Sequence, residues 1–220
     1  GMTLATEVNA NTMTARVRNY PDTLTRELSA ENLPSDIYTT LVAEVNTGLP
    51  TLHRYFKLRA RMLGIEDLAY YDIYPSLVSS DKNFNLATSA ELTLAALEPF
   101  GEEYLNHLKQ GINANWVHAY PGKGKRSGAY MNGSAYDVHP YVLLNHNDDF
   151  NSLSTYAHEW GHAVHSLLAN NAQPYSKADY STFIAEMASQ INEILLEEYM
   201  LENAETDEEK LFYPEKYLKI

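Results

Sequence analysis

The stretch that decides the fold is His158-Glu159-Trp160-Gly161-His162, which has the pattern H-E-x-x-H. Its two histidines are just over one helical turn apart, so both imidazoles can reach one metal ion. Glu159 lies about 100° further round the helix, beside the metal, where it can take a proton from a metal-activated water. The pattern therefore predicts a zinc site together with its general base. The alternative is a pair of histidines on a solvated face or in the core.

The residues around the motif predict an amphipathic helix of about four or five turns. Its apolar positions recur at three- and four-residue steps: Leu153, Tyr156, Ala157, Trp160, Val164, Leu167 and Leu168. Candidate N-caps precede it at Asn147, Asp148, Asp149, Asn151 and Ser152, and Asn170-Asn171 followed by Pro174 predicts its end. Within the helix, the bare Cα of Gly161 would let another backbone or a substrate approach closely.

A catalytic zinc takes three protein ligands and keeps a further position open. The chain has no cysteine, so the third ligand must be His, Asp or Glu, and Glu186 is the best candidate. Glu186 lies in a second predicted helix, Phe183 to Tyr199, which can pair antiparallel with the first around the metal. The alternative is a surface carboxylate that the helix dipole favours in a first turn.

Three further residues near the predicted ligands carry weaker assignments. His165 lies about 10 Å along the helix axis from His158, so these two cannot share an ion. We interpret His165 as a group behind the ligands or facing the substrate, and a core or surface histidine is an equal alternative. Ser189 and Gln190, one turn beyond Glu186, could orient its carboxylate.

These motifs resemble a known family. The segments His158 to Ser166, Phe183 to Gln190 and Asn192-Glu193 are similar to the oligoendopeptidase F branch of the thimet-oligopeptidase-like zinc peptidases. Further similar stretches are Tyr71 to Tyr74, Pro121 to Lys123, Gly124 to Tyr130, Pro140 to Asn145, and Arg16 to Leu63 with Tyr20 and Leu52 to Tyr55. The resemblance implies one zinc on His158, His162 and Glu186, Glu159 as base, and short peptides as substrates.

Members of that family are longer than this chain. The resemblance therefore implies that residues 1–220 are a single zincin-like catalytic domain without the family's N-terminal helical region and C-terminal segment. That segment carries the His and Tyr side chains thought to stabilise the tetrahedral intermediate. We therefore expect a poor catalyst, because loss of such a donor typically costs about 10²–10³ in turnover. We also expect an uncovered apolar surface, and therefore either a homo-oligomer formed through it or a metal site open to solvent.

The composition is that of an ordinary globular domain with one substantial core or two lobes. The chain has 220 residues, is 45% hydrophobic, and carries 16 basic against 29 acidic residues for a net charge of −13. This balance argues against nucleic acid or an anionic membrane as partner and mildly favours cationic peptides. No signal peptide or membrane-spanning apolar run is evident, so we predict a cytoplasmic protein.

The remaining sequence predicts a mainly α fold with a small β-hairpin or sheet beside the active-site helix. The expected helices cover residues 9–18, 35–63 with an interruption near Gly48 and Pro50, 88–100 and 102–110. Residues 128–131 and 141–144 are predicted strands, joined by a turn near Asn132-Gly133. The acidic stretch 202–210 is expected to be a solvated helix or loop.

The predicted strand at residues 138–144 suggests how a substrate binds. An exposed edge strand can hold an extended peptide through backbone hydrogen bonds. Tyr136, His139 and Tyr141 are near enough in sequence to line the cleft, although packing is the more frequent role of a tyrosine in a chain with 17 of them. Lys123, Lys125 and Arg126 could hold a peptide's carboxylate, or could simply form a basic turn.

The sequence thus predicts a zinc-dependent endopeptidase that hydrolyses short oligopeptides, with Glu159 as general base. Two alternatives from other classes remain open. One is a helical binding module in which zinc only joins two helices, although such a structural site usually has four protein ligands. The other is a catalytically impaired fragment that binds peptides or partner chains.

Overall fold

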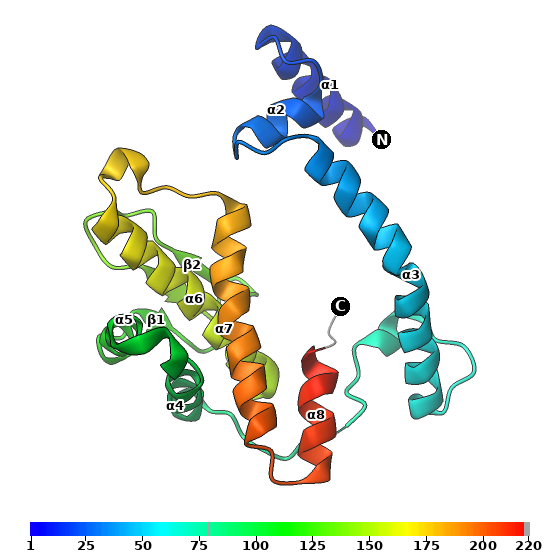
Figure 1. Cartoon of the computed structure of the whole chain (residues 1–220), viewed down its shortest axis with the longest axis vertical. Helices are drawn as coiled ribbons and strands as arrows, with labels where there is room; N and C mark the ends of the chain where they lie inside the picture. Colours follow the sequence, from blue (N-terminus) through cyan, green and yellow to red (C-terminus); the bar gives the residue numbers. More distant parts are fainter. Residues whose placement is uncertain (79, 218–220) are drawn as a thin grey trace. The chain divides into compact units, whose positions relative to one another are not determined.

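The computed structural model describes residues 1–78 and 80–217, with the side chain of Tyr217 left aside. The chain divides into two compact units, residues 1–75 and the residues from Ser76 onward (Figure 1). Most described residues are helical and a small sheet completes the fold, which confirms the predicted mainly α class. Whether both units belong to one catalytic domain over 1–220 stays a prediction.

The first unit consists of three α-helices and a short 3-10 helix. These are α1 (Met2–Val17), α2 (Thr23–Ser29), α3 (Asp36–Leu63) and η1 (Tyr70–Ile73). The predicted interruption near Gly48 and Pro50 is wrong, because α3 runs unbroken with Pro50 inside it. Proline removes one backbone hydrogen bond, and the other bonds of this long helix persist on both sides. The helix ends at Gly64, whose positive φ of 69° suits glycine.

A buried arginine joins α3 to the last residues of the first unit by hydrogen bonds. The side chain of Arg59 is 1% exposed and donates from Nε to the carbonyl of Asp72 at 2.8 Å and from Nη2 to the carbonyl of Pro75. The segment after α3 is therefore folded back against the helix that precedes it. Burying the guanidinium is tolerated because carbonyl groups accept its hydrogen bonds.

The second unit is built around the contact of two long helices, α6 (Phe150–Ala172) and α7 (Thr182–Glu202). Asp149 caps α6 by accepting the N–H of Ser152 at 2.8 Å, so one of the predicted caps is the one used. The short 3-10 helix η3 (Tyr175–Lys177) lies in the segment between them, and Figure 1 shows α6 and α7 side by side and running in opposite directions. This arrangement agrees with the predicted antiparallel pair.

Gly161 permits this close helix contact. A Cβ placed on it would lie 2.7 Å from Ser189 Cα and 2.8 Å from the carbonyl oxygen of Ala188, both backbone atoms of α7. Any side chain at this position would therefore force the helices apart. The close approach of another backbone that the sequence suggested for Gly161 is confirmed.

The sheet has three short strands in the order β1-β3-β2: β1 (Val117–His118), β2 (Tyr130–Asn132) and β3 (Tyr141–Leu143). β2 and β3 are antiparallel, as predicted, but residues 133–140 connect them in place of a tight turn at Asn132-Gly133. The prediction of an exposed edge strand at 138–144 is wrong, because β3 has a neighbour on each side. The sequence did not reveal β1, which pairs in parallel with β3 and is only two residues long.

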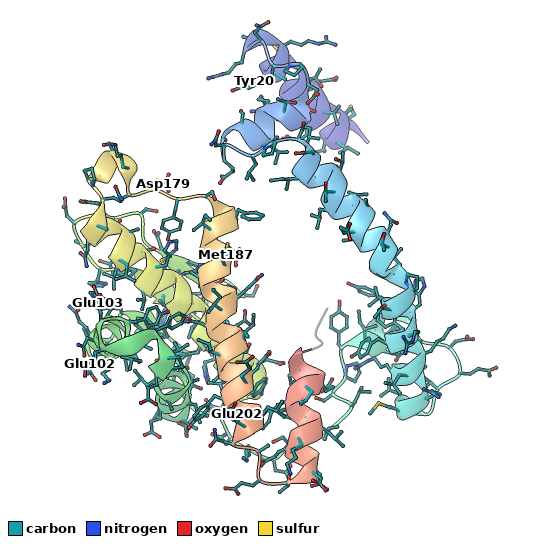
Figure 2. All side chains as sticks on the ribbon, viewed as in Figure 1. Tyr20, Glu102, Glu103, Asp179, Met187 and Glu202 are labelled. Carbon is teal, nitrogen blue, oxygen red and sulfur yellow. The ribbon has the colours of Figure 1, made fainter. Side chains whose placement is uncertain are left out.

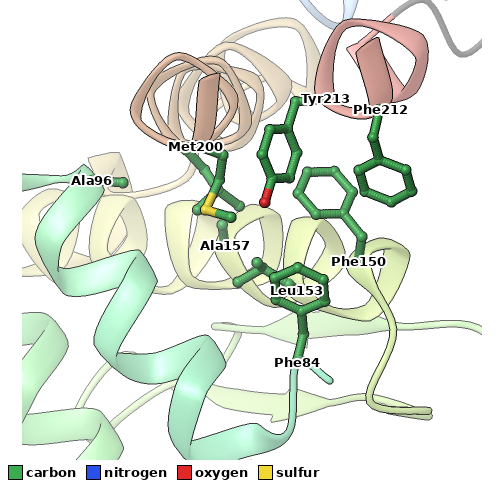
Figure 3. Packing of buried hydrophobic residues seen from close by; sticks show 9 residues of the cluster. Phe84, Ala96, Phe150, Leu153, Ala157, Met200, Phe212 and Tyr213 are labelled. Carbon is green, nitrogen blue, oxygen red and sulfur yellow. The ribbon is translucent and has the colours of Figure 1, made fainter. Parts of the chain in front are cut away.

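Two apolar clusters hold α6 and α7 in place. One lies where α4 (Leu86–Ala96) and α8 (Asp207–Tyr217) meet these helices, and Figure 3 shows its aromatic contacts. Its members are Phe84, Ala96, Phe150, Leu153, Ala157, Leu196, Met200, Phe212 and Tyr213. The acidic stretch 202–210 ends in the first turn of α8, which then contributes Phe212 and Tyr213 to the core. Residues 202–210 are mostly exposed and form the end of α7, a turn and the start of α8, in agreement with the predicted solvated helix or loop.

The second cluster lies between α6, the sheet and α5 (Gly101–Asn113), which the 3-10 helix η2 (Glu98–Phe100) precedes. Its buried members include Leu108, Trp116, Val142, Tyr156 and Trp160. The small sheet therefore packs on one side of the helix that carries the H-E-x-x-H motif. Among the described residues, no helix has the length and hydropathy needed to cross a bilayer.

Candidate metal centre

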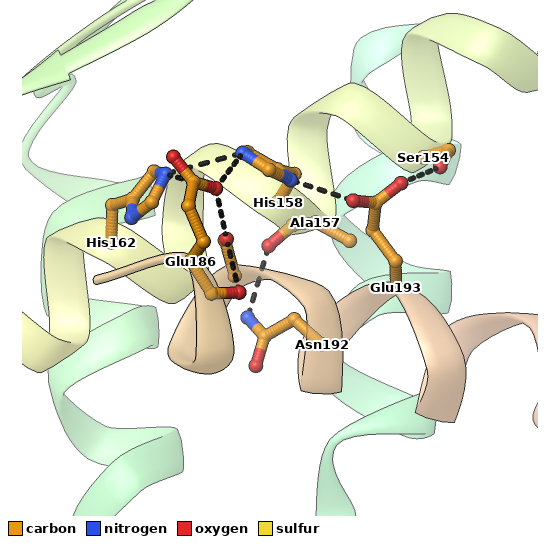
Figure 4. A network of polar contacts seen from close by, with 8 residues as sticks. Ser154, Ala157, His158, His162, Glu186, Asn192 and Glu193 are labelled. Atoms are coloured by element: carbon orange, nitrogen blue, oxygen red, sulfur yellow. Dashed lines mark hydrogen bonds and ion pairs between the residues drawn. The ribbon is translucent and has the colours of Figure 1, made fainter. Parts of the chain in front are cut away.

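Three side chains converge where α6 faces the first turns of α7 (Figure 4). The Nε2 atoms of His158 and His162 are 3.1 Å apart, and the Oε2 atom of Glu186 lies 3.5 and 3.6 Å from them. All three ligand atoms fall within 4.8 Å of one another. The structure therefore brings together the two motif histidines and the acid predicted as third ligand.

These distances fit a zinc ion. Ligands that each stand about 2.0–2.2 Å from a tetrahedral zinc are roughly 3.3–3.6 Å from one another. The two contacts of Glu186, at 3.5 and 3.6 Å, lie in this range, and the histidine pair at 3.1 Å is slightly closer. Two imidazole nitrogens and a carboxylate oxygen are also a donor set that zinc favours. The three residues present can hold this metal.

Glu193 fixes the ring of His158 from behind. Its Oε1 accepts from Nδ1 of His158 at 2.6 Å, and its Oε2 accepts from the Ser154 hydroxyl at 2.7 Å (Figure 4). Because Nδ1 carries the proton, Nε2 presents its lone pair to the site. Although burial lowers the pKa of His158, the hydrogen bond and charge of Glu193 and the nearby charges of Glu159 and Glu186 hold it above its usual value.

Glu193 belongs to the Asn192-Glu193 segment that resembles the family, but its contact with His158 was not predicted from the sequence. A signal was available: Glu193 follows Glu186 by two helical turns, so both carboxylates lie on the same face of α7. What the spacing could not supply was the position of His158 against that face. That position depends on where α6 and α7 cross.

Glu186 is held by its own helix. The hydroxyl of Ser189 donates to Oε2 of Glu186 at 3.0 Å and lies 3.0 Å from its carbonyl oxygen. Of the two residues predicted to orient this carboxylate, Ser189 therefore contacts it, whereas Gln190 is exposed. Behind them, Asn192 donates to the carbonyl of Ala157 at 2.9 Å and so joins α7 to α6.

Glu159 lies beside the three converging groups and is 5% exposed. Burial raises the pKa of its carboxyl to about 7, although the charge of His158 and a backbone hydrogen bond from Met131 of β2 oppose the increase. Its Oε2 has no hydrogen-bond partner among the described residues. A buried carboxyl with an unused oxygen and a pKa near neutrality is suited to accept and release a proton. The other motif residue, His162, has its pKa lowered by burial and then by His158.

The structure separates the residues predicted to line a cleft. Tyr136 lines a cavity of about 680 Å³ beside β2, and its hydroxyl donates to the carbonyl of Gln173 at 2.6 Å. His139 instead stacks on Trp116, with ring centroids 4.5 Å apart, and contacts the ring of Tyr141 at the same distance. The aromatic group of His139 and Tyr141 is thus packed around Trp116, and a role in binding substrate stays a prediction for both.

Two other predicted groups have partners of their own. The ring of His165 lies 4.1 Å from that of Tyr180, and burial lowers its pKa. Lys125 donates to the backbone carbonyls of His118 and Tyr120 at 2.9 and 2.6 Å. Its ammonium group thus stabilises its own loop, and binding of a peptide carboxylate by this basic turn stays a prediction.

A mainly helical fold with His, His and Glu around one point and a second Glu beside it defines the class of metallopeptidase-like proteins. The chain belongs to peptidase family M3, whose sequence model matches residues 2–219. It is 40% identical over 211 residues to oligopeptidase PepF of Bacillus subtilis, covering 96% of this chain and 31% of that protein. It is 39% identical over 216 residues to group B oligopeptidase PepB of Streptococcus agalactiae, covering 98% of this chain and 36% of that protein.

Solved structures give the same family. Oligoendopeptidase-F from Enterococcus faecium is 29% identical with a TM-score of 0.63, over 99% of this chain and 31% of that one. A peptidase structure from Chlamydophila abortus is 36% identical with a TM-score of 0.80, over 96% of this chain and 36% of that one. The chain therefore spans about a third of the length of the relatives it matches.

Proposed function

We propose that this chain carries the catalytic metal centre of a zinc-dependent endopeptidase that hydrolyses short oligopeptides. The observation that carries the proposal is the buried carboxyl of Glu159 beside three converging ligand atoms. Membership of peptidase family M3 and the names of the relatives, which are oligopeptidases, support the reaction and the substrate class. A cytoplasmic location remains a prediction from the composition.

The proposed chemistry assigns a role to each group around the site. His158, His162 and Glu186 would hold one zinc, which as a Lewis acid would polarise the scissile carbonyl and make a water more acidic. Glu159 would take a proton from the attacking water while the oxygen of that water bonds to the carbonyl carbon. When the C–N bond breaks, Glu159 would pass that proton to the leaving amine nitrogen, so that its carboxylate is restored.

The alternative of a purely structural zinc has less support. Structural sites usually close around the metal with four protein ligands, and three converge among the described residues. A structural site also has no use for a buried carboxyl beside the ligands.

Self-association through apolar surface stays a prediction, although α7 does expose Phe183, Ile184 and Met187, the last by 50%.

The test combines metal analysis with cleavage of internally quenched oligopeptides. We expect about one zinc per chain, loss of most of it in His162→Ala, and no loss in His53→Ala, which changes an exposed histidine of α3. Glu159→Gln should keep the metal and lose about 10²–10⁴-fold in turnover, because the variant keeps the size of the side chain without its basicity. Full metal content in His162→Ala, or unchanged cleavage by Glu159→Gln, would contradict the proposal.

A further inference from the structure

The cavity beside β2 is lined by a residue that also contacts Glu159. Met131 of β2 lines this cavity, and its backbone forms the hydrogen bond that lowers the pKa of Glu159. On the helix side, Ser166 lines the cavity, and its hydroxyl lies 3.8 Å from the sulfur of Met131. Strand β2 therefore contacts both the proposed base and the cavity.

The backbone of β2 is open to a further strand at this place. In the described sheet, β2 has β3 on one side only. Val142 of β3 donates its N–H to Trp116 at 2.9 Å, so the backbone polar groups of Val142 face away from β2. Met131 is its antiparallel partner, and the two residues of such a pair both turn their N–H and C=O outward. The N–H and C=O of Met131 therefore face the open edge. Its N–H donates to Glu159, so its C=O is the group that can pair with an extended peptide.

The lining of the cavity favours a positive charge. Asp179, on the segment between α6 and α7 (Figure 2), contributes the one carboxylate of the lining, and no Lys, Arg or His is among the described lining residues. One carboxylate oxygen accepts the N–H of Tyr180 at 3.0 Å, and the residue is exposed. The lining also includes four aromatic rings, those of Tyr130, Tyr136, Tyr175 and Tyr180. Aromatic faces and a carboxylate together attract a cation on a long apolar stem.

The position of the cavity along α6 sets which substrate residue reaches it. Ser166 follows Glu159 by almost two turns, which is about 10 Å along the helix axis. An extended peptide advances about 3.3 Å per residue. A peptide on the open edge of β2 with its scissile bond near Glu159 would therefore place a side chain two or three residues away at the cavity.

We propose that this cavity is a subsite for a lysine or arginine side chain of the peptide, and that Asp179 determines this preference. The proposal rests on the proposed peptidase function, because it assumes that the peptide passes Glu159. The cavity, at about 680 Å³, has room for a long side chain together with its water. The net charge of −13 adds a general attraction for cationic peptides.

Binding tests the subsite separately from catalysis. The zinc-loaded Glu159→Gln variant is titrated into dye-labelled oligopeptides that carry lysine, norleucine or glutamate at one position at a time. At one position, two or three residues from the cleaved bond, lysine should bind about three- to tenfold more tightly than norleucine, and glutamate more weakly than both. Adding Asp179→Asn should reduce the affinity advantage of the lysine peptide to less than about twofold and leave the affinity of the norleucine peptide unchanged. Added salt should also reduce the affinity advantage of the lysine peptide.

Asp137→Asn is the matched control, because it removes one exposed carboxylate from the segment between β2 and β3 without changing the cavity lining. The ratio of lysine to norleucine affinity should stay the same in this variant. Equal affinity for the lysine and norleucine peptides at every position, an advantage unaffected by Asp179→Asn, or no peptide binding at all would overturn the subsite. Peptides that bind with the expected ratio but are not cleaved by the unmodified chain would overturn the peptidase proposal alone.

Discussion

His158 depends on a residue outside the motif that contains it. Glu193 accepts a hydrogen bond from Nδ1 of His158 at 2.6 Å and another from the hydroxyl of Ser154 (Figure 4). A carboxylate behind a ligating histidine sets its tautomer and ring orientation, and makes the other nitrogen a stronger donor. The candidate metal centre therefore includes Glu193 and Ser154 as well as the three proposed ligands.

Replacing Glu193 by Gln should weaken zinc binding about 10–100-fold, because the amide can neither supply the charge nor hold the proton on Nδ1 as firmly. Glu198→Gln is the control, since it changes an exposed carboxylate of the same helix. Zinc dissociation constants from competition with a chromogenic chelator measure both. Equal constants for Glu193→Gln and Glu198→Gln would mean that Glu193 does not support the site.

At this scale the sequence was most informative where chemistry and spacing coincide. The H-E-x-x-H spacing predicted that His158 and His162 face one point, and the need for a third ligand in a chain without cysteine pointed to Glu186 on the second predicted helix. The contact of Glu193 and the stacking of His139 on Trp116 could not be predicted in this way. Both depend on which residues of separate elements meet, and no local pattern encodes that.

At the scale of elements, the crossing of α6 and α7 determines the geometry of the site. The bare Cα of Gly161 lies against backbone atoms of Ala188 and Ser189, and the crossing brings Glu186 within 3.6 Å of both histidines. Long helices with strong periodicity were predictable, and so was this crossing residue. The two-residue strand β1 was not, because so short a stretch has no recognisable period, and without it β3 was taken for an edge.

Gly161→Ala should destabilise the second unit by about 1–3 kcal/mol, because the new Cβ meets backbone that cannot turn aside. Zinc affinity should fall with it, since the ligands sit on the two helices forced apart. Both tryptophans, Trp116 and Trp160, belong to this unit, so urea unfolding followed by their fluorescence reports its stability.

Gly48→Ala supplies the comparison for that measurement. Gly48 lies in the middle of α3, in the other unit, and a Cβ there meets nothing within 4 Å. The change should favour that helix by up to about 1 kcal/mol and leave the fluorescence transition where it was. A transition of Gly161→Ala that coincides with that of the unmodified chain would show that the crossing is not tightly packed.

At the scale of the whole molecule, the two units differ in how many side chains they bury. In the first unit the buried side chains among the described residues are Ala15, Arg59 and Ala60, whereas both apolar clusters belong to the second. The second unit also buries polar groups that join its helices, such as Asn192 of α7, which accepts a hydrogen bond from the hydroxyl of the partly buried Tyr104 of α5 at 2.9 Å. The stability of the second unit should therefore respond to pH through such groups.

Alkaline pH should weaken the second unit through Tyr104. Burial raises the pKa of Tyr104 to about 12, although its hydrogen bond to Asn192 opposes the increase. The folded state thus keeps a proton that an unfolded tyrosine loses near pH 10. The stabilisation is complete below about pH 10 and is lost as pH rises toward 12, by up to about 2–3 kcal/mol.

Tyr104→Phe tests this origin. The variant should be less stable at pH 8 by about 1 kcal/mol, because Asn192 loses a hydrogen bond. It should then lose less stability than the unmodified chain between pH 9 and pH 11.5, as measured by urea unfolding. The variant should still lose some stability at alkaline pH, since burial also raises the pKa of Tyr156. Parallel curves for the two proteins would exclude Tyr104 as the source.

The three candidate metal ligands all lie on one helical hairpin, with only residues 173–181 between its helices. Closing so short a connection costs little chain entropy, whereas β1, β3 and the α4 and α8 contacts join segments far apart in the sequence. His158, His162, Glu186 and Glu193 can therefore meet early, before the sheet and the outer helices have docked. An ion that binds at that stage stabilises the hairpin against reopening, and so favours the folding route as well as the finished site.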